Sequence, residues 1–330
     1  MRRRPALLFS AKVLFSLALL AALLYTVDFA ELWLAAKNIR VGLLLLAVGM
    51  FFPTQLLSAY RWYYLLRILG ARLSYGTVVR YTFLGQFSAL FLPGQISGDI
   101  VRATAIAQKD QQYAQSFLSL LLDKLTFLFA ISLFAFIGAQ SSPVLAHFPG
   151  LRIASAAIAA LSLAGVILCA MYRDRRLPTW LMGLWPKTHG ILARGLKQIV
   201  GLVAVPRLSI SAITWMVLCA LGLQVVNTVG SYVLARSMNV MVAPLDWMAV
   251  NAVVAIIQIL PISIGGLGVR EGTFVFLLSF YGVSASHALA FSLITFILVA
   301  LLVTLGWIVV EAFAFQRGGR LSKLSRRGDM

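Results

Sequence analysis

Acidic residues are scarce in this chain of 330 residues. It has 10 Asp and Glu against 28 Lys and Arg, and charged residues of both signs make up only 12% of the sequence, whereas hydrophobic residues make up 61%. Soluble domains average about 25% charged residues. The shortage of charge and the excess of apolar residues therefore exclude a soluble protein and predict one that lies in a membrane.

Residues with catalytic or ligand chemistry are also few. The three histidines lie far apart without the spacing of a metal site, and both cysteines lie inside separate apolar runs. No glycine-rich loop ending in Lys-Ser or Lys-Thr is present, which argues against an ATP-driven pump. The net charge of +18 is dispersed among apolar runs rather than gathered on a soluble domain, so we expect no nucleic-acid partner. We also expect no metal, no cofactor and no enzymatic activity.

Apolar runs dominate what is present. A helix of roughly 20 apolar residues crosses the hydrocarbon core of a bilayer, and without a barrel pattern lipid leaves helices as the only spanning choice. The sequence therefore predicts an all-α polytopic membrane protein, with residues 1–330 as a single transmembrane domain. Runs of spanning length lie near 7–27, 41–60, 116–137, 152–172, 209–235 and 286–312, and shorter, interrupted runs lie near 79–98, 247–262 and 272–283.

Basic residues predict the orientation. If both termini are cytoplasmic and the segments near 79–98 and 247–262 do not cross, most Lys and Arg fall in cytoplasmic loops, including the stretch 173–207 and a basic cytoplasmic tail over 313–330. We therefore expect a multi-pass protein of the bacterial inner (plasma) membrane. Its basic cytoplasmic face would attract anionic headgroups.

An internal repeat divides the chain into a first half, 7–137, and a second half, 152–312. "LPGQISGDIVR" (92–102) and "LPISIGGLGVR" (260–270) both read L-P-x4-G-x2-V-R and both end an apolar run. Three full spans separate the two copies, and because three is odd the copies face opposite sides of the membrane. The sequence thus predicts an inverted repeat with two broken, re-entrant segments.

Broken segments in matching places are typical of alternating-access transporters, whose binding site forms where they meet. Proline ends helical hydrogen bonding and glycine relieves backbone strain, so the residues expected to shape the breaks are Pro93, Gly98, Pro261, Gly265 and Gly266. The helix after each break would present free N–H groups that suit a phosphate. The alternative is a pair of ordinary proline kinks or interfacial loops.

The strings "RWYYLLRILG" (61–70), "LPGQISGDIVRA" and above all "LPISIGGLGVREG" (260–272) resemble the lysylphosphatidylglycerol synthase transmembrane region family, also called flippase-like integral membrane proteins. The resemblance covers nearly the whole chain and implies lipid translocation. Its best understood members also carry a cytoplasmic synthase domain; here only a short basic segment follows Glu311, so lipid aminoacylation is not expected. The lipid cargo does not follow from the resemblance.

Arg102 and Arg270 are the residues we expect to bind phosphate, because a guanidinium makes paired hydrogen bonds to phosphate and stays charged. Their neighbours Asp99 and Glu271 would hold them in place or bind an amine of the headgroup. The alternative is that each arginine only fixes orientation.

Asp123 and Lys124 interrupt an apolar run, where ionisable groups are costly. They point about 100° apart on a helix, so separate partners are expected; proton coupling by Asp123 stays open. Arg61 is a further candidate, and its alternative is a charge anchor in an interfacial aromatic belt.

The sequence favours translocation of an anionic phospholipid or a polyprenyl-phosphate-linked lipid. A first alternative is a membrane partner that does not transport but presents lipid to a separate synthase or glycosyltransferase. A second is a membrane-embedded transferase acting on lipid-linked sugars through Asp99, Asp123 or Glu271.

Overall fold

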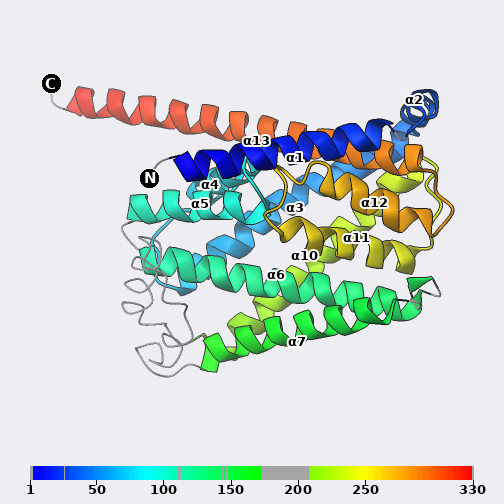
Figure 1. The fold of residues 1–330 in the computed structure, drawn as a ribbon. Helices are drawn as coiled ribbons and strands as arrows, with labels where there is room; N and C mark the ends of the chain where they lie inside the picture. The colour runs from blue at the N-terminus through cyan, green and yellow to red at the C-terminus, as the bar shows by residue number, and fades with distance from the viewer. Residues whose placement is uncertain are drawn as a thin grey trace.

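Long helices lying side by side form the body of the protein in the computed structural model (Figure 1). The structure describes residues 3–25, 27–110, 113–142, 144–145, 148–171 and 208–328. Within these residues every regular element is a helix, which confirms the predicted all-α multi-pass membrane protein. The helices long and apolar enough to span a membrane are α3 (Val41–Ile68), α6 (Tyr113–Ser141), α7 (Pro149–Met171), α10 (Ile210–Ser237) and α13 (Ala285–Gly328).

The chain begins with α1 (Arg3–Tyr25) and α2 (Phe29–Lys37), which make a sixth span if they count as one unit bent by 92°. Helix α1 begins and α13 ends at the same end of the bundle (Figure 1). The predicted tail over 313–330 continues α13 as far as Gly328. The basic segment predicted over 173–207 lies outside the described residues.

Large apolar side chains cover the outer face of the bundle. On α13 alone, seven are more than half exposed: Ile297, Leu301, Leu305, Ile308, Val309, Phe313 and Phe315. A soluble protein rarely exposes so continuous an apolar surface, whereas in a bilayer this surface lies against hydrocarbon. The long spans are therefore stabilised by lipid on one side and by neighbouring helices on the other.

Four shorter helices form two hairpins. The first hairpin consists of α4 (Tyr75–Ala89) and α5 (Gln95–Asp110), and the second of α11 (Pro244–Ile259) and α12 (Val269–Ser279). Each helix has at most 16 residues, too few to cross about 30 Å of hydrocarbon. The hairpins enter the bundle from opposite ends and their tips meet near its middle (Figure 1). Helices end after both apolar runs, at Ala89 and at Ile259; the re-entrant character of the two segments and the duplication of the halves stay predictions.

Backbone hydrogen bonds join the two tips. The N–H of Gly94 donates to the carbonyl of Ser263 at 3.2 Å, and the N–H of Gly265 donates to the carbonyl of Leu92 at 3.3 Å. Polar backbone inside a bundle of spanning helices must find partners in the protein. Each tip therefore supplies hydrogen-bond partners for some of the backbone N–H and carbonyl groups of the other tip.

Only glycine fits at the two tip positions that make these bonds. Gly94 has φ +70° and Gly265 has φ +57°, in the left-handed region that disfavours residues with a side chain. A Cβ on Gly94 would lie 3.0 Å from Cα of Pro261, and one on Gly265 would lie 2.8 Å from the carbonyl oxygen of Leu90. The tips approach closely because both residues lack a side chain.

A buried tryptophan anchors each hairpin to the bundle. Trp62 of α3 packs in the core formed with α4 and α5, and Trp247 of α11 packs edge-on against Phe291 of α13 with ring centroids 5.0 Å apart. Each indole N–H donates to a serine hydroxyl at 3.0 Å, Trp62 to Ser119 and Trp247 to Ser231. The buried indole nitrogens are thus satisfied, and both hairpins rest on rigid spans.

Candidate functional site

A polar cavity of about 420 Å³ lies where the hairpins meet the spanning helices. Helices α3, α4, α5, α6, α10, α11, α12 and α13 all contribute to its walls. Its volume lies within the range of small-ligand sites. The residues proposed from the sequence that line it are Arg61, Gly98, Asp99, Arg102, Asp123, Lys124, Gly265 and Arg270.

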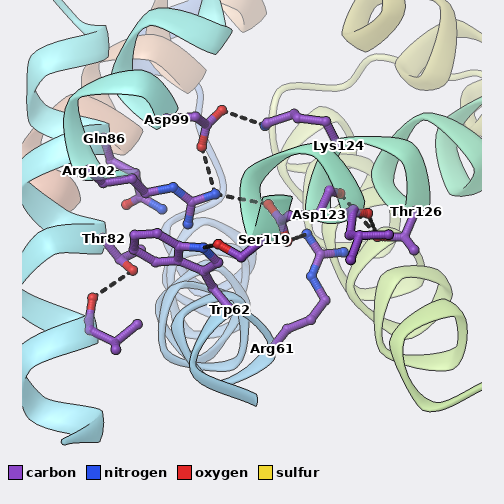
Figure 2. Close-up of polar contacts among 12 residues, drawn as sticks. Arg61, Trp62, Thr82, Gln86, Asp99, Arg102, Ser119, Asp123, Lys124 and Thr126 are labelled. Atoms are coloured by element: carbon purple, nitrogen blue, oxygen red, sulfur yellow. Dashed lines mark hydrogen bonds and ion pairs between the residues drawn. The ribbon is translucent and has the colours of Figure 1, made fainter. Parts of the chain in front are cut away.

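Five charged side chains in this cavity form a continuous chain of ion pairs, which we call the ion cluster. Arg61 lies 2.7 Å from Asp123, Asp123 lies 2.9 Å from Arg102, Arg102 lies 2.7 Å from Asp99, and Asp99 lies 2.5 Å from Lys124 (Figure 2). Asp123 and Lys124 therefore have separate partners, as predicted from their positions on one helix. The cluster ties α3, α5 and α6 together.

The arginines of the ion cluster are buried rather than interfacial. Arg61 is 5% exposed and Arg102 is 4% exposed. Helix α3 continues for almost two turns beyond Arg61, to Ile68, which places this arginine inside the bundle. Both arginines are therefore held by contacts within the protein, and the roles proposed for them from the sequence stay predictions.

Both arginines keep a donor that no protein atom accepts. The Nε of Arg61 and the Nε of Arg102 are buried without a hydrogen-bond partner. The guanidinium of Arg102 also lies over the ring of Trp62, 4.2 Å from its centroid. A buried, unpaired N–H is costly, so both arginines keep a donor whose hydrogen bond the protein itself does not supply. The contact between Arg102 and Trp62 was not predicted from the sequence. The pattern that could have indicated it is a tryptophan directly after a charged residue within a span.

Arg270 belongs to a second, smaller ion pair on the other hairpin. Its guanidinium bonds to the carboxylate of Glu271 and, at 3.0 Å, to the hydroxyl of Ser292. The second oxygen of Glu271 accepts the backbone N–H of Gly268 at 2.6 Å. Glu271 thus holds Arg270 in place, which is one of the two roles that the sequence suggested for it. It also caps α12, so the N–H of Gly268 is not one of the free N–H groups expected at the start of this helix.

The remaining predicted residues shape the backbone. Pro93 and Pro261 lie at the tips of the two hairpins. A Cβ on Gly98 would lie 2.2 Å from the carbonyl oxygen of Gly85, so α4 and α5 can touch only through glycine. Gly266 adopts φ +79° in the loop before α12. These residues form the close helix contacts around the cavity.

Neutral amide side chains line much of the rest of the cavity. Asn251 donates to the hydroxyl of Thr228 at 3.5 Å, and Gln86 donates to Gln55 at 2.6 Å, while the carbonyl oxygen of Gln86 is buried without a partner. Gln55 and Gln224 were not singled out from the sequence. The amide residues of the cavity are Gln55, Gln86, Gln224, Asn227, Asn251 and Gln258.

A larger apolar groove of about 780 Å³ lies on the far side of the second hairpin, lined by residues of α1, α7, α11 and α12 such as Leu19, Leu151 and Phe276. No ionisable residue lines it. Across the described residues no group of three His, Cys, Asp or Glu side chains could hold a metal ion. Of the two cavities, only the polar one is therefore lined by ionisable side chains.

The sequence matches the family described as the lysylphosphatidylglycerol synthase TM region over residues 9–306. The match contains both hairpins and the whole ion cluster. No curated protein matches the chain.

Proposed function

The chain belongs to the lysylphosphatidylglycerol synthase TM region family, and on this premise we propose that it carries a lipid headgroup across the membrane. The cargo is an anionic phospholipid or a polyprenyl-phosphate-linked lipid. One observation carries the proposal: two buried arginines, Arg61 and Arg102, line a polar cavity at the meeting point of two hairpins, and each keeps a buried Nε–H that no protein atom accepts.

Phosphate is the anion that this arrangement fits best. A guanidinium binds phosphate through several N–H donors and stays charged at every physiological pH. Ionisable residues inside a membrane are costly and mark substrate pathways. A headgroup phosphate in the cavity would satisfy the free donors of Arg61 and Arg102, while the acyl chains stay in the bilayer.

The proposed mechanism uses one arginine from each hairpin. Arg102 holds the phosphate when the cavity opens toward the cytoplasm, and Arg270 holds it when the cavity opens to the other side. Both line the same cavity, although their hairpins enter from opposite ends of the bundle. Exchange between the two states requires one hairpin to move against the other. The driving force is an ion gradient or the lipid gradient itself.

We further propose that the protein lies in the bacterial inner membrane with both termini cytoplasmic. The basic residues near the two ends of the chain support this orientation. So does the position of the start of α1 and the end of α13 at one end of the bundle (Figure 1).

Leaflet exchange in liposomes tests the proposal. Purified protein is reconstituted with labelled phosphatidylglycerol or labelled polyprenyl phosphate, and a membrane-impermeant quencher is added outside. We expect quenching beyond the outer-leaflet fraction seen in protein-free liposomes. Folded protein that moves neither lipid would contradict translocation and favour a membrane partner that presents lipid to a separate synthase or glycosyltransferase.

A further inference from the structure

The charges around the polar cavity do not cancel. Among the described residues that line it, two are acidic, Asp99 and Asp123, and one further carboxylate, Glu271, pairs with a lining arginine. Three carboxylates therefore face four basic side chains, and although each basic side chain has a carboxylate partner, the group carries a net charge of +1. The lining basic residues are Arg61, Arg102, Lys124 and Arg270.

The excess charge belongs to the ion cluster. Arg270 and Glu271 form a neutral pair, whereas the cluster has three basic residues and two carboxylates. Lys124 is its most exposed member, with a side chain 22% exposed. An unbalanced charge inside a membrane is unfavourable, so a ligand bringing a single negative charge stabilises this cavity more than a neutral or a doubly charged one.

The carboxylates leave no place for a cationic headgroup. Asp99 holds Arg102 and Lys124, and Asp123 holds Arg61 and Arg102. Glu271 binds Arg270 and a backbone N–H. A headgroup ammonium would have to break one of these pairs, whereas the amide side chains of the cavity both donate and accept hydrogen bonds and therefore suit hydroxyl groups.

Resting on the proposed function, we propose that the cavity selects lipids whose headgroup is a phosphodiester with a single negative charge and uncharged hydroxyl groups. Phosphatidylglycerol and a polyprenyl-phosphate-linked hexose share this chemistry. A phosphomonoester carries a charge of about −1.5 to −2 at neutral pH. Phosphatidic acid and polyprenyl phosphate therefore bring more negative charge than the excess positive charge of the cavity. Phosphatidylethanolamine brings no net charge and an ammonium group.

Matched lipid pairs test the selection in liposomes at pH 8. Phosphatidylglycerol is compared with phosphatidic acid, and the polyprenyl-linked hexose with polyprenyl phosphate, each pair having identical chains. We expect each diester that moves to exchange about tenfold faster than its monoester, and the faster diester identifies the chain type. Phosphatidylmethanol, a diester without hydroxyl groups, should exchange more slowly than phosphatidylglycerol; equal rates would refute the role of the amides.

Charge variants give the sharper test. Asp99→Asn raises the net charge of the ion cluster by one, so the ratio of diester to monoester exchange should fall about tenfold. Lys124→Met removes the excess charge and should shift preference toward phosphatidylethanolamine. Lys109→Met, an exposed lysine in the last turn of α5 outside the cavity, is the matched control.

The outcomes separate this inference from the proposed function. If every lipid exchanges equally fast, or if Asp99→Asn and Lys124→Met keep the wild-type ratios while remaining folded by size-exclusion chromatography, the charge selection is wrong and translocation stands. If no lipid moves at all, the proposed function is wrong and the selection falls with it.

Discussion

The backbone N–H of Gly94 donates a hydrogen bond to the carbonyl of Ser263 at 3.2 Å, and this bond links two hairpins that are far apart in the sequence. The contact lies beside the cavity that holds the ion cluster. Any movement of one hairpin against the other must break or shift it. Movement of one hairpin against the other would therefore change the tip contact and the cavity together.

Replacing Gly94 with alanine should destabilise the protein by about 1–2 kcal/mol. The backbone there has φ +70°, and the new Cβ would press on Cα of Pro261 at 3.0 Å. The free energy of unfolding can be measured by titration with a denaturing detergent. Gly222→Ala on α10 is the matched control, because a Cβ there meets nothing within 4 Å. Equal stability of the two variants would contradict a strained tip at Gly94.

A disulfide between the tips should stop lipid exchange. Pro93 and Ile264 are paired in an antiparallel bridge; they lie between the two tip hydrogen bonds, a pairing in which Cα atoms are about 4.5 Å apart and within disulfide reach. Pro93→Cys with Ile264→Cys is made with Cys169 and Cys219 replaced by alanine. Lipid exchange by the double variant should be lost on oxidation and return with reductant. Exchange by each single-cysteine variant should be unchanged by either treatment. Unchanged exchange in the oxidised double variant would show that the tips need not move.

Asp123→Asn should destabilise the protein by about 3 kcal/mol, because it leaves the buried arginines without their shared countercharge. The double variant with Arg61→Gln should lose less stability than the sum of the losses in the two single variants, because either single change already breaks the ion pair. Denaturant titration of the two single variants and the double variant measures this coupling. Asp28→Asn, at the exposed start of α2, is the control and should be nearly neutral. Strict additivity would mean that Arg61 and Asp123 do not interact.

The spans and the breaks could be predicted because they depend on local properties, namely run length, proline and glycine. The partners of Asp123 and Lys124 were predicted to be separate for the same reason: helix geometry alone turns neighbouring side chains apart. Arg102 and Arg270 were both singled out from the matching strings, and both line the same cavity.

Contacts between distant segments could not be predicted in the same way. Arg61 precedes three aromatic residues, a pattern typical of a membrane interface, and only the packing of α6 against α3 shows that it pairs with Asp123. Arg80 and Glu311 make two bonds of 2.7 Å across 231 residues, and neither residue stands in a motif. The bond from Gly268 to Glu271 depends on a glycine with φ +81° just before α12.

The central claim is that Arg102 and Arg270 both bind the phosphate during transport, and leaflet exchange of labelled lipid by four variants tests it most directly. Arg102→Ala and Arg270→Ala should lose exchange, and Arg102→Lys and Arg270→Lys should keep part of it, because lysine retains the charge but not the paired donors. Wild-type rates in all four folded variants would contradict the claim.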